Sequence, residues 1–266
     1  MRSRSLSAMK WRSIIGGGVS FILAGVAWEA FARSSILPAA ITPSISDIGI
    51  ALWGMIRNGT MFVHVGFTLF RILVGLALAI FVGVPIGMLM GRFRFAERFF
   101  LPLVSVLSPI PSLAWVPLFI IWFGLGNTAS IALVFYAATF PMILNTWTGV
   151  RSVNRLWLRA ASAMGAERQT LFAKVVLPGA LPFVIAGFRQ AFARSWIAVV
   201  GGEMIASTKW GLGWVVFDSK EFLNADVMMG TLVVIGLLGL GFERLIFQAV
   251  ENRTVARWGM VTSAKA

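Results

Sequence analysis

The sequence predicts an all-α polytopic membrane protein with six transmembrane helices. Of its 266 residues, 58% are hydrophobic and only 12% are charged, whereas soluble domains average roughly 45–50% apolar and 25% charged residues. Long apolar segments alternate with short polar loops, and a helix needs about 20 apolar residues to cross the hydrocarbon layer. Lys and Arg are concentrated in alternate loops, as expected when successive loops face opposite sides of a membrane. No internal repeat or linker interrupts the pattern, so residues 1–266 are expected to form one integral membrane domain.

Each predicted helix is an apolar segment of sufficient length. The six segments cover about residues 14–32, 62–90, 99–123, 127–148, 181–205 and 227–249. The third contains Pro102, Pro109, Pro111 and Pro117. Because proline lacks a backbone N–H and kinks a helix, we expect this segment to be bent or interrupted.

The basic residues predict the orientation. Sixteen of the 23 Lys and Arg residues lie in four segments, namely 1–13, 91–98, 149–180 and the tail from 244. The loops 33–61 and 206–226 hold only four. Loops rich in Lys and Arg remain in the cytoplasm, so both termini are predicted to be cytoplasmic, as an even number of helices requires. This distribution accounts for the net charge of +13 without a nucleic-acid partner.

Small residues recur at every fourth position of the second segment. They are Gly75, Ala79, Gly83, Gly87 and Gly91. This spacing allows two helix backbones to approach closely in a membrane. The stripe is explained either by packing within one subunit or by contact with a second copy.

The loop after the first segment predicts a short amphipathic helix. Ser44 can cap its N-terminus, and Asp47 lies where a carboxylate favours the positive end of the helix. Four apolar residues then share one face at helical spacing, namely Ile45, Ile48, Leu52 and Met55.

The polar segment 149–180 predicts two short amphipathic helices on either side of Gly165. The apolar stripes contain Leu156, Trp157, Ala160, Ala161 and Met164 in the first helix, and Leu171, Phe172, Val175 and Val176 in the second. Gly165 suits the left-handed conformation that ends a helix. Pro178 and Pro182 are expected to stop the second helix and to begin the fifth transmembrane helix. Such short helices are marginal in water, so they are expected to pack either on a protein partner or on the chain's own helices.

The spacing in this segment resembles the EAA loop of ABC-importer permeases, E-A-A-x(3)-G-x(9)-I-x-L-P. Ala160-Ala161 is followed by Gly165 and, after nine further residues, by Val175-Val176-Leu177-Pro178. Arg159 stands where that family usually has Glu. The polar contact made by that Glu is therefore in question, but the helix–Gly–helix shape is not.

The resemblance extends over about residues 37–258. The stretches PIPSLAWVPLFIIWFGLGNT, FPMILNTWTGVRSV and EMIASTKWGLGWVVFDSKEFLNAD are similar to the nitrate, sulfonate and taurine branch of these permeases. The resemblance implies type I importer architecture and a homodimer in the inner membrane. It also implies a cytoplasmic ABC ATPase dimer, and a periplasmic or lipid-anchored binding protein that delivers a small anionic solute. The residues implied to couple to the ATPase are Arg159, Ala160, Ala161, Gly165, Leu171, Phe172, Leu177 and Pro178.

The chain itself is not expected to be an enzyme or to hold a metal or cofactor. None of its five lysines follows a glycine, so it has no Gly-Lys-Ser/Thr phosphate-binding motif. ATP and Mg²⁺ are expected to bind to the separate ATPase. There is no cysteine and only one histidine, His64, which excludes thiolate catalysis and clustered Cys or His metal sites.

One charged residue near the middle of the fifth segment indicates a translocation path. Arg194 shares a helix face with Ala191 and Ala198, and Glu203 closes the same segment. Because ionisable residues inside a membrane usually face a cavity or a partner, these four residues are candidates for the path. Arg194 is expected either to attract a small anion such as a sulfonate, carboxylate or nitrate, or to pair with Glu203 of the partner subunit.

Two other classes of function remain as alternatives. An ion-coupled secondary transporter or channel would have no need of a docking loop in the cytoplasm. An intramembrane enzyme would need paired acids or a nucleophile beside a base. Asp218 and Asp226, eight positions apart in an outer loop, do not form such a pattern.

Overall fold

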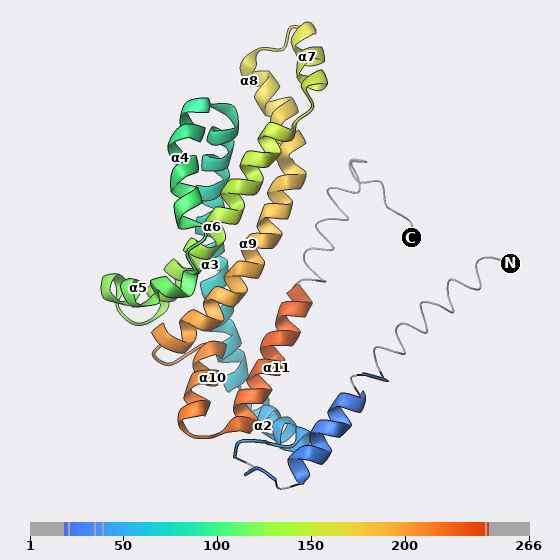
Figure 1. Cartoon of the computed structure of the whole chain (residues 1–266), viewed down its shortest axis with the longest axis vertical. Coiled ribbons are helices and arrows are strands. Elements are labelled where there is room, and N and C mark those ends of the chain that lie inside the picture. The colour runs from blue at the N-terminus through green and yellow to red at the C-terminus, as the bar shows by residue number, and fades with distance from the viewer. Residues whose placement is uncertain (1–18, 21, 35, 39, 243, 245–266) are drawn as a thin grey trace, which may run out of the picture. The chain divides into compact units, whose positions relative to one another are not determined.

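The protein is all-helical throughout the part of the chain that the structure describes. It is a computed structural model in which the described residues are 19–242, except 21, 35 and 39, together with residue 244 (Figure 1). The described residues divide into two compact units, one within residues 1–62 and 215–234 and the other within residues 63–214 and 235–266.

Four helices among the described residues are long and apolar enough to cross a membrane, or five if a bent pair counts as one. The four are Thr60–Arg92, Asn127–Ser152, Arg168–Ala206 and Ala225–Phe242. The bent pair, Arg94–Leu107 and Ser112–Phe123, turns through 87°. The bend predicted for the third segment is therefore present. The first predicted segment, 14–32, lies partly outside the described residues, and so does the end of the sixth, 227–249.

The first unit contains a helical stretch over residues 22–33 and helix α2 (Ile45–Arg57). The predicted cap by Ser44 is present, and Asp47 completes a capping box: the Asp47 N–H donates to the Ser44 hydroxyl and the Ser44 N–H donates to the Asp47 carboxylate. Glu29 adds a second link, since its carboxylate accepts a hydrogen bond from the Ile45 N–H at 2.6 Å. These bonds satisfy donors that the first turn of a helix leaves unpaired.

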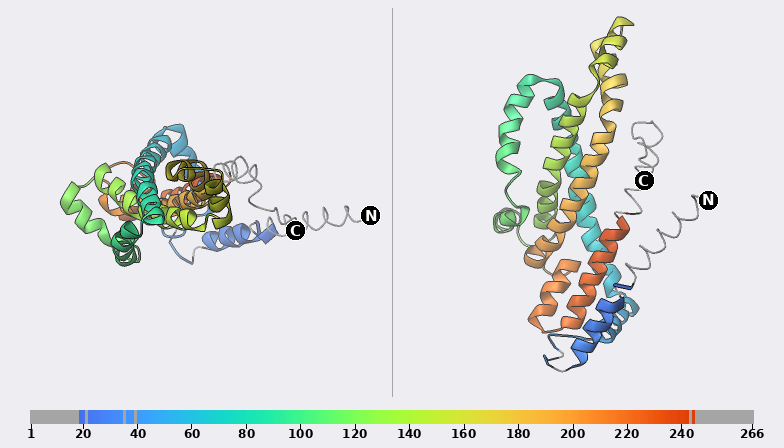
Figure 2. Two further views of the ribbon diagram at one scale, coloured as in Figure 1. Left: turned by 90° about the horizontal axis from the view of Figure 1, so that it is seen from above. Right: turned by 45° about the vertical axis from the view of Figure 1, so that its right-hand side comes forward.

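The second unit is built around the long helices α3 (Thr60–Arg92), α6 (Asn127–Ser152) and α9 (Leu177–Ala206). Their apolar side chains form a common core that includes Ile72, Leu76, Val134, Met142 and Val199. Within this unit the three helices lie side by side along most of their length in both views (Figures 1 and 2). Helix α4 (Arg94–Leu107) packs beside them, and the chain then turns through η1 (Ser112–Trp115) into α5 (Val116–Phe123).

The small-residue stripe of α3 packs against α6 of the same chain. A Cβ atom at Gly83 would lie 2.7 Å from the Met142 Cβ, and one at Gly87 would lie 2.6 Å from the Ile143 carbonyl oxygen. Atoms of the two helices therefore already occupy the space that larger side chains would need. Of the two explanations for the stripe, the structure supports packing within one subunit.

The remaining helices are either short or contain a boundary between the two units. Helix α7 (Arg155–Ala163), α8 (Arg168–Leu171) and the π-helical turn η2 (Phe172–Val176) precede α9. Helices α10 (Leu212–Glu221) and α11 (Ala225–Phe242) follow it.

Candidate functional site

The segment around Gly165 folds as a helix–Gly–helix element. Asn154 caps α7, because its side-chain oxygen accepts a hydrogen bond from the Leu156 N–H at 2.8 Å. At the other end, the Ala166 N–H donates to the Ala161 carbonyl and the Gly165 N–H donates to the Ser162 carbonyl. This pair of bonds is a Schellman motif, and Gly165 has the left-handed φ of +82° that the motif requires. The predicted turn is confirmed.

The second short helix does not stop at Pro178 or Pro182, contrary to the sequence prediction. Helix α8 continues through η2 into α9, and both prolines lie within α9. A π-helical turn lies directly before Pro178, where the Leu177 N–H donates to the Phe172 carbonyl, five residues earlier. Short π-helical segments of this kind are frequent at functional sites.

The apolar face of α7 is exposed and contacts no other part of the described chain closely enough to be buried. Leu156, Trp157 and Met164 are 68%, 50% and 82% exposed. Exposed apolar groups that share one face of a helix are typical of a protein contact. Arg159 and Ala160 are also exposed, while Ala161 is half-buried.

The base of the element is attached to the helix core. The guanidinium of Arg92, at the end of α3, lies 4.6 Å from the centre of the Phe172 ring. Leu171 is half-buried, Leu177 is 40% exposed, and Pro178 is half-buried in the first turn of α9. The chain therefore runs from α7 through the Gly165 turn and then, as continuous helix, through α8 and η2 into α9.

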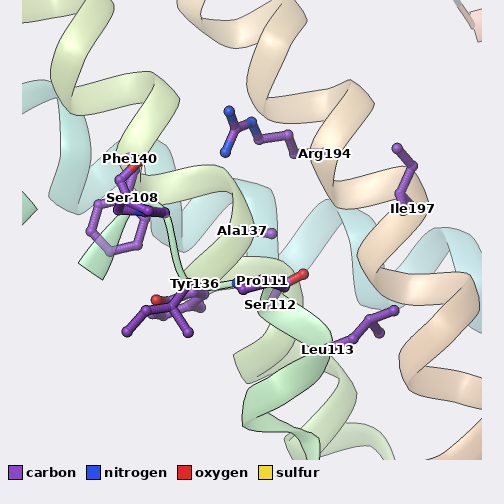
Figure 3. A pocket seen from close by; sticks show the side chains of 11 residues that line it. Ser108, Pro111, Ser112, Leu113, Tyr136, Ala137, Phe140, Arg194 and Ile197 are labelled. Atoms are coloured by element: carbon purple, nitrogen blue, oxygen red, sulfur yellow. The ribbon is translucent and has the colours of Figure 1, made fainter. Parts of the chain in front are cut away.

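A cavity lies at the break between α4 and α5. Its volume is about 300 Å³, and its walls come from the break, α6 and α9. The lining consists of residues 108–113 from the break, Tyr136, Ala137 and Phe140 from α6, and Arg194 and Ile197 from α9. Figure 3 shows the Arg194 side chain extending from α9 toward the α6 side of the cavity.

The other candidates for the translocation path lie elsewhere. Ala191 and Ala198 are fully buried in α9, on the side packed against the core, and neither lines this cavity. Arg194 was expected to share a helix face with these two alanines. In the structure Arg194 is exposed, whereas the two alanines are buried. The small residues serve helix packing.

Glu203 is enclosed in a polar network within the second unit. Its Oε1 accepts a hydrogen bond from Arg71 Nη1 at 2.7 Å, and the side chains of Arg71 and Glu203 are 3% and 0% exposed. Its Oε2 accepts hydrogen bonds from the Thr68 hydroxyl and the Gly213 N–H, both at 2.9 Å. Both carboxylate oxygens therefore have partners within the chain, and the Glu203 side chain is fully buried beside Arg71 of the same chain.

The same network holds the loop between α9 and α10. Thr68 also accepts a hydrogen bond from the Leu212 N–H at 2.9 Å, and the ring of His64 accepts one from the Gly211 N–H at 3.2 Å. Arg71 further donates to the Asn127 side chain at 2.9 Å. Sequence reasoning assigned no role to these residues of α3, because nothing local in the sequence connects them to a loop about 140 positions later.

The sequence was compared with models of known protein families. Residues 83–252 match the model of the binding-protein-dependent transport system inner membrane component. The match covers more than half of the chain. The chain belongs to this family of ABC-importer permeases.

Several relatives support the assignment at the level of the whole permease. The taurine transport system permease protein TauC of Escherichia coli is 35% identical over 204 residues, which is 77% of this chain and 74% of that protein. A putative ABC transporter permease of Methanocaldococcus jannaschii is 33% identical over 225 residues, covering 84% of each chain. A bicarbonate transport system permease, CmpB of Synechococcus elongatus, is 27% identical over 257 residues and 92% of each chain.

The fold of the permease agrees with a solved transporter. A chain of the methionine ABC transporter MetNI in inward-facing conformations superposes with a TM-score of 0.60 at 22% identity, covering 74% of this chain and 96% of that chain. Permeases of this family are multi-pass inner membrane proteins and are not themselves enzymes, because a separate subunit hydrolyses ATP.

Proposed function

We propose that this permease imports a small anionic solute that a substrate-binding protein delivers, and that it works as a homodimer with a cytoplasmic ATPase dimer. The observation that carries the proposal is the exposed apolar face of α7, which the Gly165 turn and the continuous helix through α8 and η2 join to α9. A docked ATPase subunit would cover this face. Movement of α7 would then be transmitted to the helices of the core.

In the proposed transport cycle, the ATPase contacts the permease differently in its outward-open and inward-open states. ATP and Mg²⁺ bind to the ATPase dimer and favour one relative position of the two α7 elements. Hydrolysis favours the other position. Because the docked partner has different contacts in each, it shifts the population between outward-open and inward-open permease. This chain contributes the path and the mechanical connection.

The anionic solute is supported by two observations. Relatives of the permease transport taurine, aliphatic sulfonates and bicarbonate according to their names, and all three solutes carry an anionic group. In this chain a guanidinium lines the cavity at the α4–α5 break. A cation inside a membrane protein is costly unless water or an anion accompanies it.

Reconstitution with the partner proteins tests the proposal. We expect uptake of ethanesulfonate into proteoliposomes to require the permease, the ATPase, the binding protein and ATP together. Trp157→Ser should lower uptake and the ATPase activity stimulated by the binding protein by at least about tenfold, since central aromatic contacts of an interface contribute about 2 kcal/mol or more. Phe95→Ser, which removes an aromatic residue that is 84% exposed on α4, is the matched control and should have a smaller effect. Uptake driven by an ion gradient in the absence of the ATPase would overturn the proposal.

A further inference from the structure

We propose that the cavity at the α4–α5 break is a solute-binding site that selects organic monoanions with a short apolar chain. Arg194 recognises the anionic head, and the apolar walls hold the chain. The inference rests on the proposed import of an anionic solute and specifies the solute class. It assigns to the permease a selectivity of its own, in addition to that of the binding protein.

The charge of the cavity comes from a single side chain. Arg194 is exposed and lines the cavity, and no ion pair connects it to any carboxylate among the residues that the structure describes. The carboxylate on the same helix, Glu203, already forms an ion pair and a hydrogen bond with Arg71. A guanidinium in this situation favours a planar or tetrahedral oxyanion, because it can donate two parallel hydrogen bonds.

The rest of the lining is mostly apolar. Ile110 and Leu113 come from the break, Phe140 from α6, and Ile197 from the turn of α9 next to Arg194. The Tyr136 hydroxyl is already engaged, since it donates to the Leu107 carbonyl at 2.6 Å. These walls would bury a short aliphatic chain, which a small inorganic anion does not have.

The lining also argues against a zwitterion. Among the described residues that form the cavity there is no Asp or Glu. The ammonium group of a zwitterion would therefore lose water without gaining a counter-ion, which is unfavourable. The volume of about 300 Å³ lies at the lower end of the range for ligand sites, roughly 300–1,000 Å³, and fits a solute of few heavy atoms.

Direct binding to the permease–ATPase complex tests the site without the binding protein. The probe is radiolabelled butane-1-sulfonate, measured by equilibrium dialysis against the complex in nanodiscs. The competitors are butanoate, 3-aminopropane-1-sulfonate, nitrate and 1-butanol. We expect the sulfonate or the carboxylate to bind at least about tenfold more tightly than each of the other three. The alcohol lacks the charge-assisted hydrogen bond, nitrate lacks the apolar chain, and the ammonium group of the zwitterion would lose water without gaining a counter-ion. The relative affinities of butanoate and butane-1-sulfonate identify the anionic head.

Variants separate the charge from the apolar walls. Arg194→Gln should weaken binding of the probe by at least about tenfold, and Arg194→Lys should retain part of the affinity. Arg189→Gln, an identical change at an exposed position on the same helix outside the lining, should leave binding unchanged. Ile197→Ser should reduce the gain in affinity per added methylene, which is about three- to fourfold for full burial.

Two results would overturn the inference. One is equal binding of the probe by the wild type and Arg194→Gln when both have the same unfolding temperature. The other is equal competition by the zwitterion. Uptake by the wild-type permease with all partner proteins distinguishes this failure from a wider one: if the wild type imports anions while Arg194→Gln keeps the same selectivity, only this site is wrong. If the wild type imports no anion at all, the proposed function has failed as well.

Discussion

Arg71 and Glu203 show how one buried ion pair organises the second unit. Each charge has its counter-ion and further hydrogen bonds, and the side chains are almost completely enclosed. Removing both charges from such a pair often costs little, whereas removing one leaves the other buried without a partner. The pair therefore makes a sharp prediction about single and double variants.

We expect Arg71→Met to destabilise the protein by about 3–5 kcal/mol, because it strands the Glu203 carboxylate. The double variant Arg71→Met with Glu203→Gln should recover part of this loss. Thermal unfolding in detergent measures both effects. Lys220→Met removes one partner of the exposed pair Lys220–Glu221 and should cost less than about 1 kcal/mol. Equal effects of Arg71→Met and Lys220→Met would contradict the role given to the buried pair.

Asp47 predicts a local dependence on pH at the start of α2. Hydrogen bonds from the Ser44 hydroxyl and the Ser44 N–H lower the pKa of this carboxyl below its ordinary value of 3.8. Because the folded pKa is lowered, the carboxylate stabilises the helix above the unfolded pKa, and this contribution is lost as the pH falls through the folded pKa.

The corresponding measurement is amide hydrogen exchange in α2, corrected for the intrinsic rates. Wild-type α2 should be better protected than α2 of Asp47→Asn at about pH 7, and the difference should shrink below about pH 4, where the unfolded-state carboxyl becomes protonated. A difference that is constant over this range would show that the charge of Asp47 does not contribute.

At the scale of elements, the close contact between α3 and α6 depends on glycine residues, which have no side chain. The glycines of the stripe bring the two backbones close together, so one added methyl group must displace atoms of the opposite helix. Van der Waals contact of this kind replaces the hydrophobic driving force that lipid cannot supply.

Two alanine substitutions on the same helix test this contact. Gly83→Ala should destabilise the protein by about 1–3 kcal/mol, because its Cβ would lie 2.7 Å from the Met142 Cβ and 3.1 Å from the Thr139 carbonyl oxygen. In Gly66→Ala, apart from the neighbouring residues and backbone of the same helix, no atom lies within 4 Å of the new Cβ. This variant should be neutral or up to about 1 kcal/mol more stable, since alanine favours helix over glycine. The order of the two unfolding temperatures is the readout, and the reverse order would contradict the packing.

At the scale of the whole molecule, the distribution of Lys and Arg predicts which loops face the cytoplasm. The chain contains no cysteine, so a single introduced cysteine reports its own location. Ser162 in α7 and Thr208 after α9 are both exposed, and α9 separates them by a helix of 30 residues. At about 1.5 Å per residue this length exceeds the hydrocarbon thickness of about 30 Å.

We therefore expect the two positions to be labelled from opposite sides. A membrane-impermeant maleimide should react with Thr208→Cys in spheroplasts, and with Ser162→Cys only after the membrane is permeabilised. The cysteine-free wild type is the control for background labelling. Labelling of Ser162→Cys from outside would contradict the orientation that the distribution of Lys and Arg predicts.

The sequence alone determined the features that depend on local composition and spacing. Apolar length placed the long helices, and the proline cluster 109–111 predicted the bend between α4 and α5. The short-range pattern around Gly165 predicted the turn and the family. These features could be read because lipid imposes an apolar length, a proline removes a donor, and a left-handed turn requires glycine, each within a few residues of the cause.

The tertiary structure alone decided which distant residues meet. It paired Arg71 with Glu203, 132 positions away, and directed the small-residue stripe toward α6 of the same chain. It brought Arg194 to a cavity at the α4–α5 break while burying Ala191 and Ala198 in the core. It also carried α8 into α9 without a stop, through a π-helical turn directly before Pro178. The physical reason is common to all of these: helical periodicity defines the faces of a helix, but the packing of whole helices determines what each face contacts.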